Sequence, residues 1–426
     1  MTSDVEPPPL AVEHLRAGRY QEAMAVCRER LAEDPADRGA LRLLARSLIH
    51  LNQIPLALLL LEQALKPGDE PALLADLGDA LAAAGSDDSA ADAYGRALAG
   101  KPAGVEPHFG LLELGRRADL EARLRSAAES EPDDAAVHFA LANVLLESEE
   151  PASARHAFER AVALDPKFAG QHARVGASLA MKGQHERASR MYRWGLALNP
   201  GDPELRHLCE ALEGHSAAER ASDAYLTQVF DGFADTFEET LERLEYRGPE
   251  LVVGALRNWL PPPGRELTML DAGCGTGLCG PLLRPLAARL VGIDLSPRML
   301  ELAHASGSYD ELRRQELVEG LTRDRGVYDA IVAADVLIYF GALEELLGAS
   351  ADALRPGGVF AFNIEREAQR GYALRSSGRY AHSPEYIRSA AESAGLIVRD
   401  MRDGDLRLEA GRPVAGVVAV LEAPRA

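Results

Sequence analysis

Lysine is scarce in this sequence, and its four residues (66, 101, 167 and 182) all lie in the first half of the chain. Acidic residues outnumber basic ones by 66 to 46, which leaves a formal net charge of −20. No dense run of Lys and Arg interrupts this acidic background. Such a field repels a phosphate backbone or an anionic membrane surface. The sequence therefore predicts that neither nucleic acid nor membrane is a partner, and its preference for Arg over Lys indicates a GC-rich bacterial genome.

Cysteine and long apolar runs are also rare. The four cysteines, at 27, 209, 274 and 279, have no paired metal-ligand spacing, which is typical of reduced thiols in a cytosolic protein without a bound metal. The opening MTSDVEPPPL contains no apolar signal core. No stretch approaches the roughly 18 apolar residues that a membrane helix needs. We therefore expect a cytoplasmic protein.

The first half of the chain is periodic. When Pro166 is aligned on Pro200, the offset is 34 residues, and the small and apolar positions of the two segments coincide. Ala142 then falls on Gly176, for example. The other copies are a first one containing GRYQEA (18–23), two at 38–69 and 71–104, and a shortened one at 104–134.

This pattern resembles the tetratricopeptide repeat, a pair of antiparallel helices in which small residues permit close helix contact. The resemblance implies an all-α solenoid over residues 4–214, in which 203–214 (PELRHLCEALEG) form a capping helix that ends at Gly214. Arrays of this kind present a concave groove, so a protein or peptide partner is expected there. An array that only dimerises or stabilises the second half is an equal alternative.

From residue 265 onward, short apolar runs alternate with helical patterns. The runs LTMLDAG, RLVGID, YDAIVAAD and GVFAFNIE indicate buried parallel strands. This alternation predicts an α/β core over 265–426 with a doubly wound, Rossmann-like parallel sheet. A final pair of runs near 396–404 and 413–423 has no helix between its members and should form an antiparallel hairpin. Residues 215–264 are expected to hold a linker and the helices that precede the core.

A glycine loop directly follows the first predicted strand, as Asp271-Ala-Gly-Cys-Gly-Thr-Gly277. Its glycines permit a tight turn and close approach to a ligand. Asp294 ends the second predicted strand, seventeen residues after Gly277. A carboxylate at that place can accept both hydroxyls of a ribose. A plain strand-to-helix turn and a helix-capping Asp are the structural alternatives.

Together these features resemble the class I S-adenosylmethionine-dependent methyltransferases, and the whole chain resembles bacterial members with an N-terminal tetratricopeptide array. The resemblance implies S-adenosylmethionine as the cofactor. The family more often has Asp at the position of Glu316. The alternative to cofactor binding is therefore that Glu316 is a solvated surface residue. The resemblance also implies that segment 229–252, with Phe230, Phe233 and Phe237 at helical spacing, forms a lid over the cofactor; core packing of these rings and a surface position for Arg247 are the alternative. The implied cofactor-binding residues are Asp271, Gly273, Cys274, Gly275, Gly277, Asp294, Leu295, Glu316 and Leu317, with Tyr246 and Arg247 near the methionine end.

The segment from Asp335 to Tyr339 lines the methyl-transfer site in this family. His382 is the leading candidate for a general base because its unperturbed pKa lies near 6.5. Asp335 and Tyr339 are alternatives as base or orienting group, and a purely structural role is the alternative for His382. The implied function is methyl transfer to an oxygen, nitrogen or carbon of a small molecule or a protein. A scaffold that binds the cofactor without catalysis is the main alternative, and a nicotinamide-dependent oxidoreductase is disfavoured by the glycine spacing.

Overall fold

The chain forms two compact units. The computed structural model describes residues 8–16, 19–66, 68–99, 106–148, 150–181, 183–213, 219–260, 266–409 and 412–425. By their contacts, unit 1 comprises Met1–Arg174 with Trp194–Pro200, and unit 2 comprises Val175–Arg193 with Gly201–Ala426.

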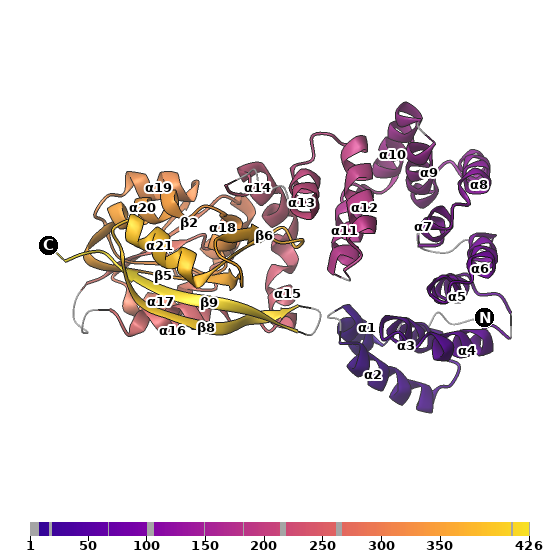
Figure 1. Cartoon of the computed structure of the whole chain (residues 1–426), viewed down its shortest axis with the longest axis horizontal. Coiled ribbons are helices and arrows are strands. Elements are labelled where there is room, and N and C mark those ends of the chain that lie inside the picture. The colour runs from indigo at the N-terminus through magenta and orange to yellow at the C-terminus, as the bar shows by residue number, and fades with distance from the viewer. Residues whose placement is uncertain are drawn as a thin grey trace. The chain divides into compact units, whose positions relative to one another are not determined.

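The described part of the first half consists of helices that follow one another in pairs (Figure 1). The pairs are α1 (Pro9–Arg16) and α2 (Tyr20–Glu33), α3 (Arg38–His50) and α4 (Ile54–Ala64), α5 (Pro71–Ala83) and α6 (Asp87–Ala99), α7 (Glu106–Glu113) and α8 (Arg117–Ser130), α9 (Ala135–Glu147) and α10 (Pro151–Leu164), and α11 (Gln171–Met181) and α12 (His185–Leu198). A 3-10 turn, η1 (Pro166–Phe168), lies between the last two pairs, and α13 (Pro203–Glu213) follows them.

The small residues of the repeat lie where two helices touch. A Cβ on Gly78 of α5 would collide with the ring of Tyr94 on α6, and one on Gly176 of α11 would collide with Tyr192 on α12. Each glycine thus leaves the space that the tyrosine ring of the next helix fills. This confirms the reason for a small residue at that repeat position.

The second half is built on one sheet (Figure 1). Its strands are β1 (Thr268–Ala272), β2 (Arg289–Asp294), β3 (Glu311–Arg314), β4 (Tyr328–Ala333), β5 (Leu354–Arg366), β6 (Tyr372–Leu374), β7 (Tyr380–His382), β8 (Ile397–Glu409) and β9 (Arg412–Glu422). The first five pair in parallel in the order β3-β2-β1-β4-β5. β9 then pairs antiparallel with β5 and with β8, while the short β6–β7 hairpin joins the end of β5. The predicted parallel sheet with an antiparallel terminal hairpin is confirmed.

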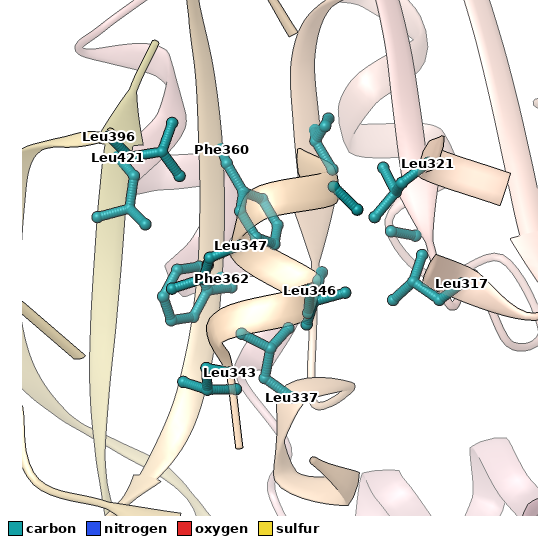
Figure 2. Close-up of a cluster of buried hydrophobic side chains, with 14 of the residues drawn as sticks. Leu317, Leu321, Leu337, Leu343, Leu346, Leu347, Phe360, Phe362, Leu396 and Leu421 are labelled. Atoms are coloured by element: carbon teal, nitrogen blue, oxygen red, sulfur yellow. The ribbon is translucent and has the colours of Figure 1, made fainter. Parts of the chain in front are cut away.

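Helices cover both faces of this sheet (Figure 1). Alternate residues of β5 point to opposite faces, so Phe360 and Phe362 belong to one core cluster while Val359 and Ala361 belong to the other. Figure 2 shows Phe360 and Phe362 packed against the leucines of α20. One face carries α16 (Gly248–Arg257) and α17 (Gly280–Leu283), and the other carries α19 (Leu317–Arg323), α20 (Glu344–Ala353) and α21 (Pro384–Ser393).

The remaining elements of the second unit precede the sheet or connect its strands. α14 (Asp223–Phe233), η2 (Ala234–Thr236) and α15 (Phe237–Arg243) precede the sheet, η3 (Arg284–Leu286) follows α17, α18 (Pro297–Ala305) follows β2, and η4 (Leu337–Tyr339) follows β4.

Helix α13, predicted to cap the repeats, packs with the sheet-containing unit. His207 on α13 is buried, its Nε2–H donates to the carbonyl of Gly378 at 2.8 Å, and its ring stacks on Tyr225 of α14 at 4.1 Å. The division by contacts places α13 in unit 2, together with Val175–Arg193, and the predicted end of the array at residue 214 stays a prediction. The sequence did not reveal the packing of His207 because Gly378 lies 171 residues away in the chain.

Among the helices of the described ranges, none is both long enough and apolar enough to cross a lipid bilayer.

Candidate functional site

The glycine loop after β1 is closed on one side and open on another. Gly273, Gly275 and Gly277 all have positive φ angles, of 72°, 55° and 96°, in the region that favours glycine. A Cβ on Gly273 would lie 2.5 Å from a methyl carbon of Val336. A Cβ on Gly275 would meet no heavy atom within 4 Å. The loop therefore packs against the segment after β4 at Gly273 and leaves free space at Gly275.

Asp294 holds this loop to the end of β2. Its Oδ2 accepts the backbone N–H of Gly275 at 2.9 Å, and its Oδ1 accepts the N–H of Ser296 at 2.9 Å. Burial raises the pKa of Asp294. The helix α18 is capped by Ser296, whose Oγ accepts the N–H of Met299 at 3.1 Å. Asp294 is thus not the helix cap that the sequence offered as its alternative role.

Asp271 lies beneath the loop and is fully buried. The hydroxyl of Tyr309 donates to its Oδ2 at 2.6 Å. Burial raises the pKa of Asp271 to about 7, the hydrogen bond from Tyr309 opposes that rise, and the nearby charge of Asp294 adds to it. Sequence reasoning missed Tyr309, because nothing in the local pattern connects it with a residue 38 positions earlier.

Two further loop residues differ in the part they can play. The Cys274 sulfur lies against β2, 3.0 Å from where a Cβ on Gly292 would stand, and burial raises the pKa of its thiol. Cys274 can therefore offer a ligand its backbone more readily than its sulfur. The Thr276 hydroxyl is buried and has no hydrogen-bond partner within the described residues. A buried hydroxyl usually has a partner, so Thr276 leaves one polar position for a ligand to satisfy.

Helix α14 lies over the ends of β2 and β4. Phe230 meets the ring of Tyr339 edge to face at 5.6 Å, and Leu295 packs in the same apolar cluster. Asp231 Oδ1 accepts the hydroxyl of Ser296 at 2.5 Å, next to Asp294. The helix that the sequence predicted as a lid thus contacts segments that flank the glycine loop.

Asp335 follows β4 in an unusual backbone conformation, with a φ of +55°. Its N–H donates to Asn363 Oδ1 at 2.8 Å, and Asn363 Nδ2 donates back to its Oδ1. Arg407 Nη1 donates to its Oδ2 at 3.0 Å. Positive φ is costly for a residue other than glycine. These bonds hold Asp335 in that conformation beside Val336, which packs on the glycine loop.

Arg407 links three carboxylates, although its side chain is only 2% exposed. Its Nη1 reaches Asp335, its Nε donates to Glu409 at 2.9 Å, and its Nη2 donates to Glu365. Arg379 also donates to Glu409. We call Asp335, Glu365, Glu409, Arg379 and Arg407 the charge cluster. Sequence reasoning missed all its members but Asp335, because charged residues on late strands usually indicate solvent-facing positions.

Two phenols border the charge cluster. Burial raises the pKa of Tyr339. Burial also raises the pKa of Tyr246, and the negative charge of Asp335 raises it further. The hydroxyl of Tyr246 is therefore near Asp335, as well as near Tyr339 and Arg407.

The other predicted cofactor residues have structural partners of their own. Glu316 caps α19, since its Oε2 accepts the N–H of Glu319 at 2.9 Å, and it pairs with Arg220 at 3.3 Å. Leu317 begins α19 and is buried. Arg247 is exposed, and its backbone N–H donates to the carbonyl of Leu406. Glu316 and Leu317 follow β3 as predicted, whereas Arg247 is exposed beside the partly buried Tyr246.

The surroundings of His382 do not favour the prediction that it is the general base. Its side chain is buried, and Nε2–H donates to the carbonyl of Gly341 at 2.9 Å. Burial lowers the pKa of His382 to about 4. Its ring packs between aromatic neighbours, 5.8 Å from Tyr372 and 5.8 Å from Tyr386. A histidine enclosed in this way is suited to supporting the loop at Gly341, so the alternatives that the sequence offered, Asp335 and Tyr339, are the better candidates.

Comparison with known proteins gives matches in both halves. The family model for a methyltransferase domain matches residues 270–360, and models for the tetratricopeptide repeat match residues 14–70 and 135–168. The first match spans the glycine loop, Asp294, Asp335 and Tyr339.

Two curated relatives match the second half. Human methyltransferase-like protein 27 is 31% identical over 173 residues, which cover 39% of this chain and 66% of that protein. The ubiquinone biosynthesis O-methyltransferase of Methylobacterium sp. (strain 4-46) is 28% identical over 158 residues, which cover 33% of this chain and 64% of that protein. The chain thus spans a little under two thirds of the length of these relatives. A solved structure of an S-adenosylmethionine-dependent methyltransferase from Mesorhizobium loti aligns with 22% identity and a TM-score of 0.33, over 40% of this chain and 96% of that one.

Proposed function

We propose that this chain, which combines tetratricopeptide repeats with a class I S-adenosylmethionine-dependent methyltransferase domain, transfers the methyl group of that cofactor to an acceptor held beside Asp335 and Tyr339. The observation that carries the proposal is the junction of two features. The open glycine loop, tied to Asp294, contacts the segment that bears Asp335. In this proposal, the cofactor site and the polar side chains that would orient an acceptor lie at the same ends of β1 and β4.

The residues of the loop fit S-adenosylmethionine. The space at Gly275 admits a ligand next to the backbone, and the Thr276 hydroxyl lacks a partner in the described part of the chain. Asp294 presents a carboxylate for two ribose hydroxyls, and Asp271 supplies a second carboxylate. S-adenosylmethionine carries positive charge and no phosphate, so two acids beside it are favourable, whereas beside a pyrophosphate they would repel.

When bound, the cofactor supplies an electrophilic methyl group on a sulfonium. The protein's part is to hold the acceptor in line with that methyl group and to keep water away. Phe230 of α14 covers Tyr339, which supports a lid role for this helix. We assign Asp335 to receiving the acceptor's proton where one must leave, and Tyr339, whose raised pKa keeps the phenol protonated, to orienting the acceptor.

The repeat array is assigned to partner binding. Its helix pairs resemble arrays that hold peptides or partner proteins, and it would present the acceptor or a regulator to the enzyme. The acceptor itself is a small molecule or a protein side chain.

Transfer of a labelled methyl group tests the proposal. Purified full-length protein is incubated with S-adenosylmethionine that carries a tritiated methyl group, in a desalted bacterial extract with its metabolites restored. We expect label in an acceptor fraction, and a loss of it in Asp294→Ala. Losing hydrogen bonds to a charged group should weaken cofactor binding roughly 10- to 100-fold. Glu392→Gln, a change at an exposed acid on α21, is the matched control.

The distribution of label separates the alternatives. Label in the macromolecular fraction would support a protein acceptor that the repeats recruit, and label in small molecules would support a metabolite. Cofactor binding without transfer to either fraction would refute catalysis and favour a scaffold that only binds the cofactor.

A further inference from the structure

The charge cluster holds more negative than positive groups. Asp335, Glu365 and Glu409 supply three carboxylates against the two guanidiniums of Arg379 and Arg407. Arg407 is engaged at all three nitrogens, each with a different carboxylate. It is therefore committed within the cluster and is not a free cation for an anionic acceptor.

Aromatic rings continue from this cluster into the lid. Tyr339 contacts Phe230 at 5.6 Å, Phe230 contacts Phe237 at 6.3 Å, and Phe237 contacts Phe233 at 5.5 Å. All four side chains remain partly exposed. The face of an aromatic ring attracts cations, and aromatic rings combined with a carboxylate are a common way to bind an ammonium group.

From these two independent features we infer that the methyl acceptor is an amine, a nitrogen nucleophile that is cationic when protonated, with Asp335 as the carboxylate beside the attacking nitrogen. This inference rests on the proposed methyl transfer and names the acceptor class of the same site. It applies equally to a small amine and to an amino group on a protein.

The step balances without any further reactant. The bound ammonium first gives one proton to Asp335, which passes it to water. The lone pair of the resulting neutral amine forms a bond to the methyl carbon while the carbon–sulfur bond breaks, and the electrons of that bond stay on the sulfur. Positive charge thereby passes from sulfur to nitrogen, and the product leaves as a methylammonium ion. Because the total charge of the reacting groups is unchanged, the same anionic surroundings stabilise them before and after transfer.

An acidic oxygen acceptor suits this site less well. A phenolate or carboxylate would have to approach a cluster that already carries an excess of negative charge, and like charges raise the free energy of the ionised form. The two guanidiniums do not relieve this, because both donate to carboxylates of the cluster.

The decisive measurement uses the unmodified protein. The full chain is given S-adenosylmethionine with a deuterated methyl group in extract with metabolites restored, and tandem mass spectrometry locates the label in each new product. Label on nitrogen would support the inference. Label on oxygen or carbon would overturn it while leaving methyl transfer intact. If no product carries label although the cofactor binds, the proposed function fails and the inference fails with it.

The Asp335→Asn variant tests the assigned residue. Asparagine tolerates a positive φ and keeps one oxygen that can accept from Arg407, although its amide nitrogen then faces the amide nitrogen of Asn363; thermal unfolding of the variant therefore checks that the fold is kept. We expect turnover of the labelled amine to fall tenfold or more, while affinities for S-adenosylmethionine and S-adenosylhomocysteine stay within about twofold of the unmodified protein. The exposed change Glu392→Gln should alter neither. The inference would be wrong if Asp335→Asn weakened binding of S-adenosylmethionine by the same factor as it lowered turnover, and left binding of S-adenosylhomocysteine unchanged. The charge cluster would then stabilise the sulfonium of the cofactor and not the acceptor.

Discussion

Removing the Tyr309 hydroxyl should make cofactor binding depend on pH in a defined way. Tyr309 donates to Asp271 at 2.6 Å, and burial has already raised the pKa of Asp271 to about 7. A hydrogen bond to a charged group contributes roughly 1.5–3 kcal/mol. In Tyr309→Phe that support for the ionised carboxylate is lost, so the pKa of Asp271 should rise by roughly one to two pH units further.

The size of the effect follows from the ionised fraction. If the cofactor's positive charge requires the Asp271 carboxylate, affinity follows the fraction that is ionised. About half is ionised at pH 7 in the unmodified protein, compared with roughly a tenth to a hundredth in Tyr309→Phe, so affinity should fall roughly 5- to 50-fold. At pH 8 the difference should narrow to roughly two- to tenfold, because the variant recovers ionised carboxylate.

Isothermal titration calorimetry with S-adenosylmethionine at pH 6, 7 and 8 provides the assay. Tyr328→Phe is a matched control, since the Tyr328 hydroxyl donates to another carboxylate, Asp324, at the start of β4 and away from the loop. Its cofactor affinity should be unchanged at every pH. If the affinity of Tyr309→Phe for S-adenosylmethionine were lower by the same factor at every pH, the reasoning would be refuted. Loss of a packing contact alone would give such a result, because it does not depend on protonation.

Three further predictions concern the loop and the charge cluster. Asp271→Asn should stabilise the cofactor-free protein, because a folded pKa of about 7, above the ordinary 3.8 of an Asp carboxyl, means that stability is lost as pH rises through this window. Thermal unfolding should show little gain near pH 4 and a gain of up to roughly 4 kcal/mol above pH 7, and an equal gain at both would contradict this origin. Gly273→Ala should destabilise by roughly 2–4 kcal/mol through its positive φ and the contact with Val336. Gly275→Ala shares the positive φ but meets no atom, so it should destabilise by only about 1 kcal/mol and lower cofactor affinity as well; denaturant titration and calorimetry together separate the two effects. Arg407→Met should lower the free energy of unfolding, measured with denaturant, by roughly 3–5 kcal/mol, because buried carboxylates lose their cationic partner. A loss below about 1 kcal/mol would show that the cluster is solvated.

Features that depend on neighbours in the chain were predictable. The 34-residue period identified the repeats because each helix pair uses the same small contact positions, such as Gly78 and Gly176. The strands β1, β2, β4 and β5 were evident because their residues are buried on both faces, so the sequence shows apolar runs and not alternation. The terminal hairpin followed from the missing helix between β8 and β9.

The site was only partly predictable. The glycine loop and Asp294 are encoded within one strand–loop–helix–strand unit, so their spacing carries the information. His382 was chosen from its ordinary pKa, yet that pKa is a property of its surroundings, and burial lowers it to about 4. Arg247 was chosen for its charge, but it is exposed while the adjacent Tyr246 is near Asp335.

The sequence by itself determined the two-part architecture, the order of strands and helices, and the loop and acid of the cofactor site, because periodicity and short-range spacing record local structure. The tertiary structure alone decided which carboxylates gain hydrogen-bond partners. Tyr309 donates to Asp271, and Arg407 donates to Asp335, which is 72 residues earlier in the chain. It also moved α13 to the second unit through His207. The physical reason is common to all three. Burial and charge pairing are created where distant segments meet, and no local pattern of residues states which segments those will be.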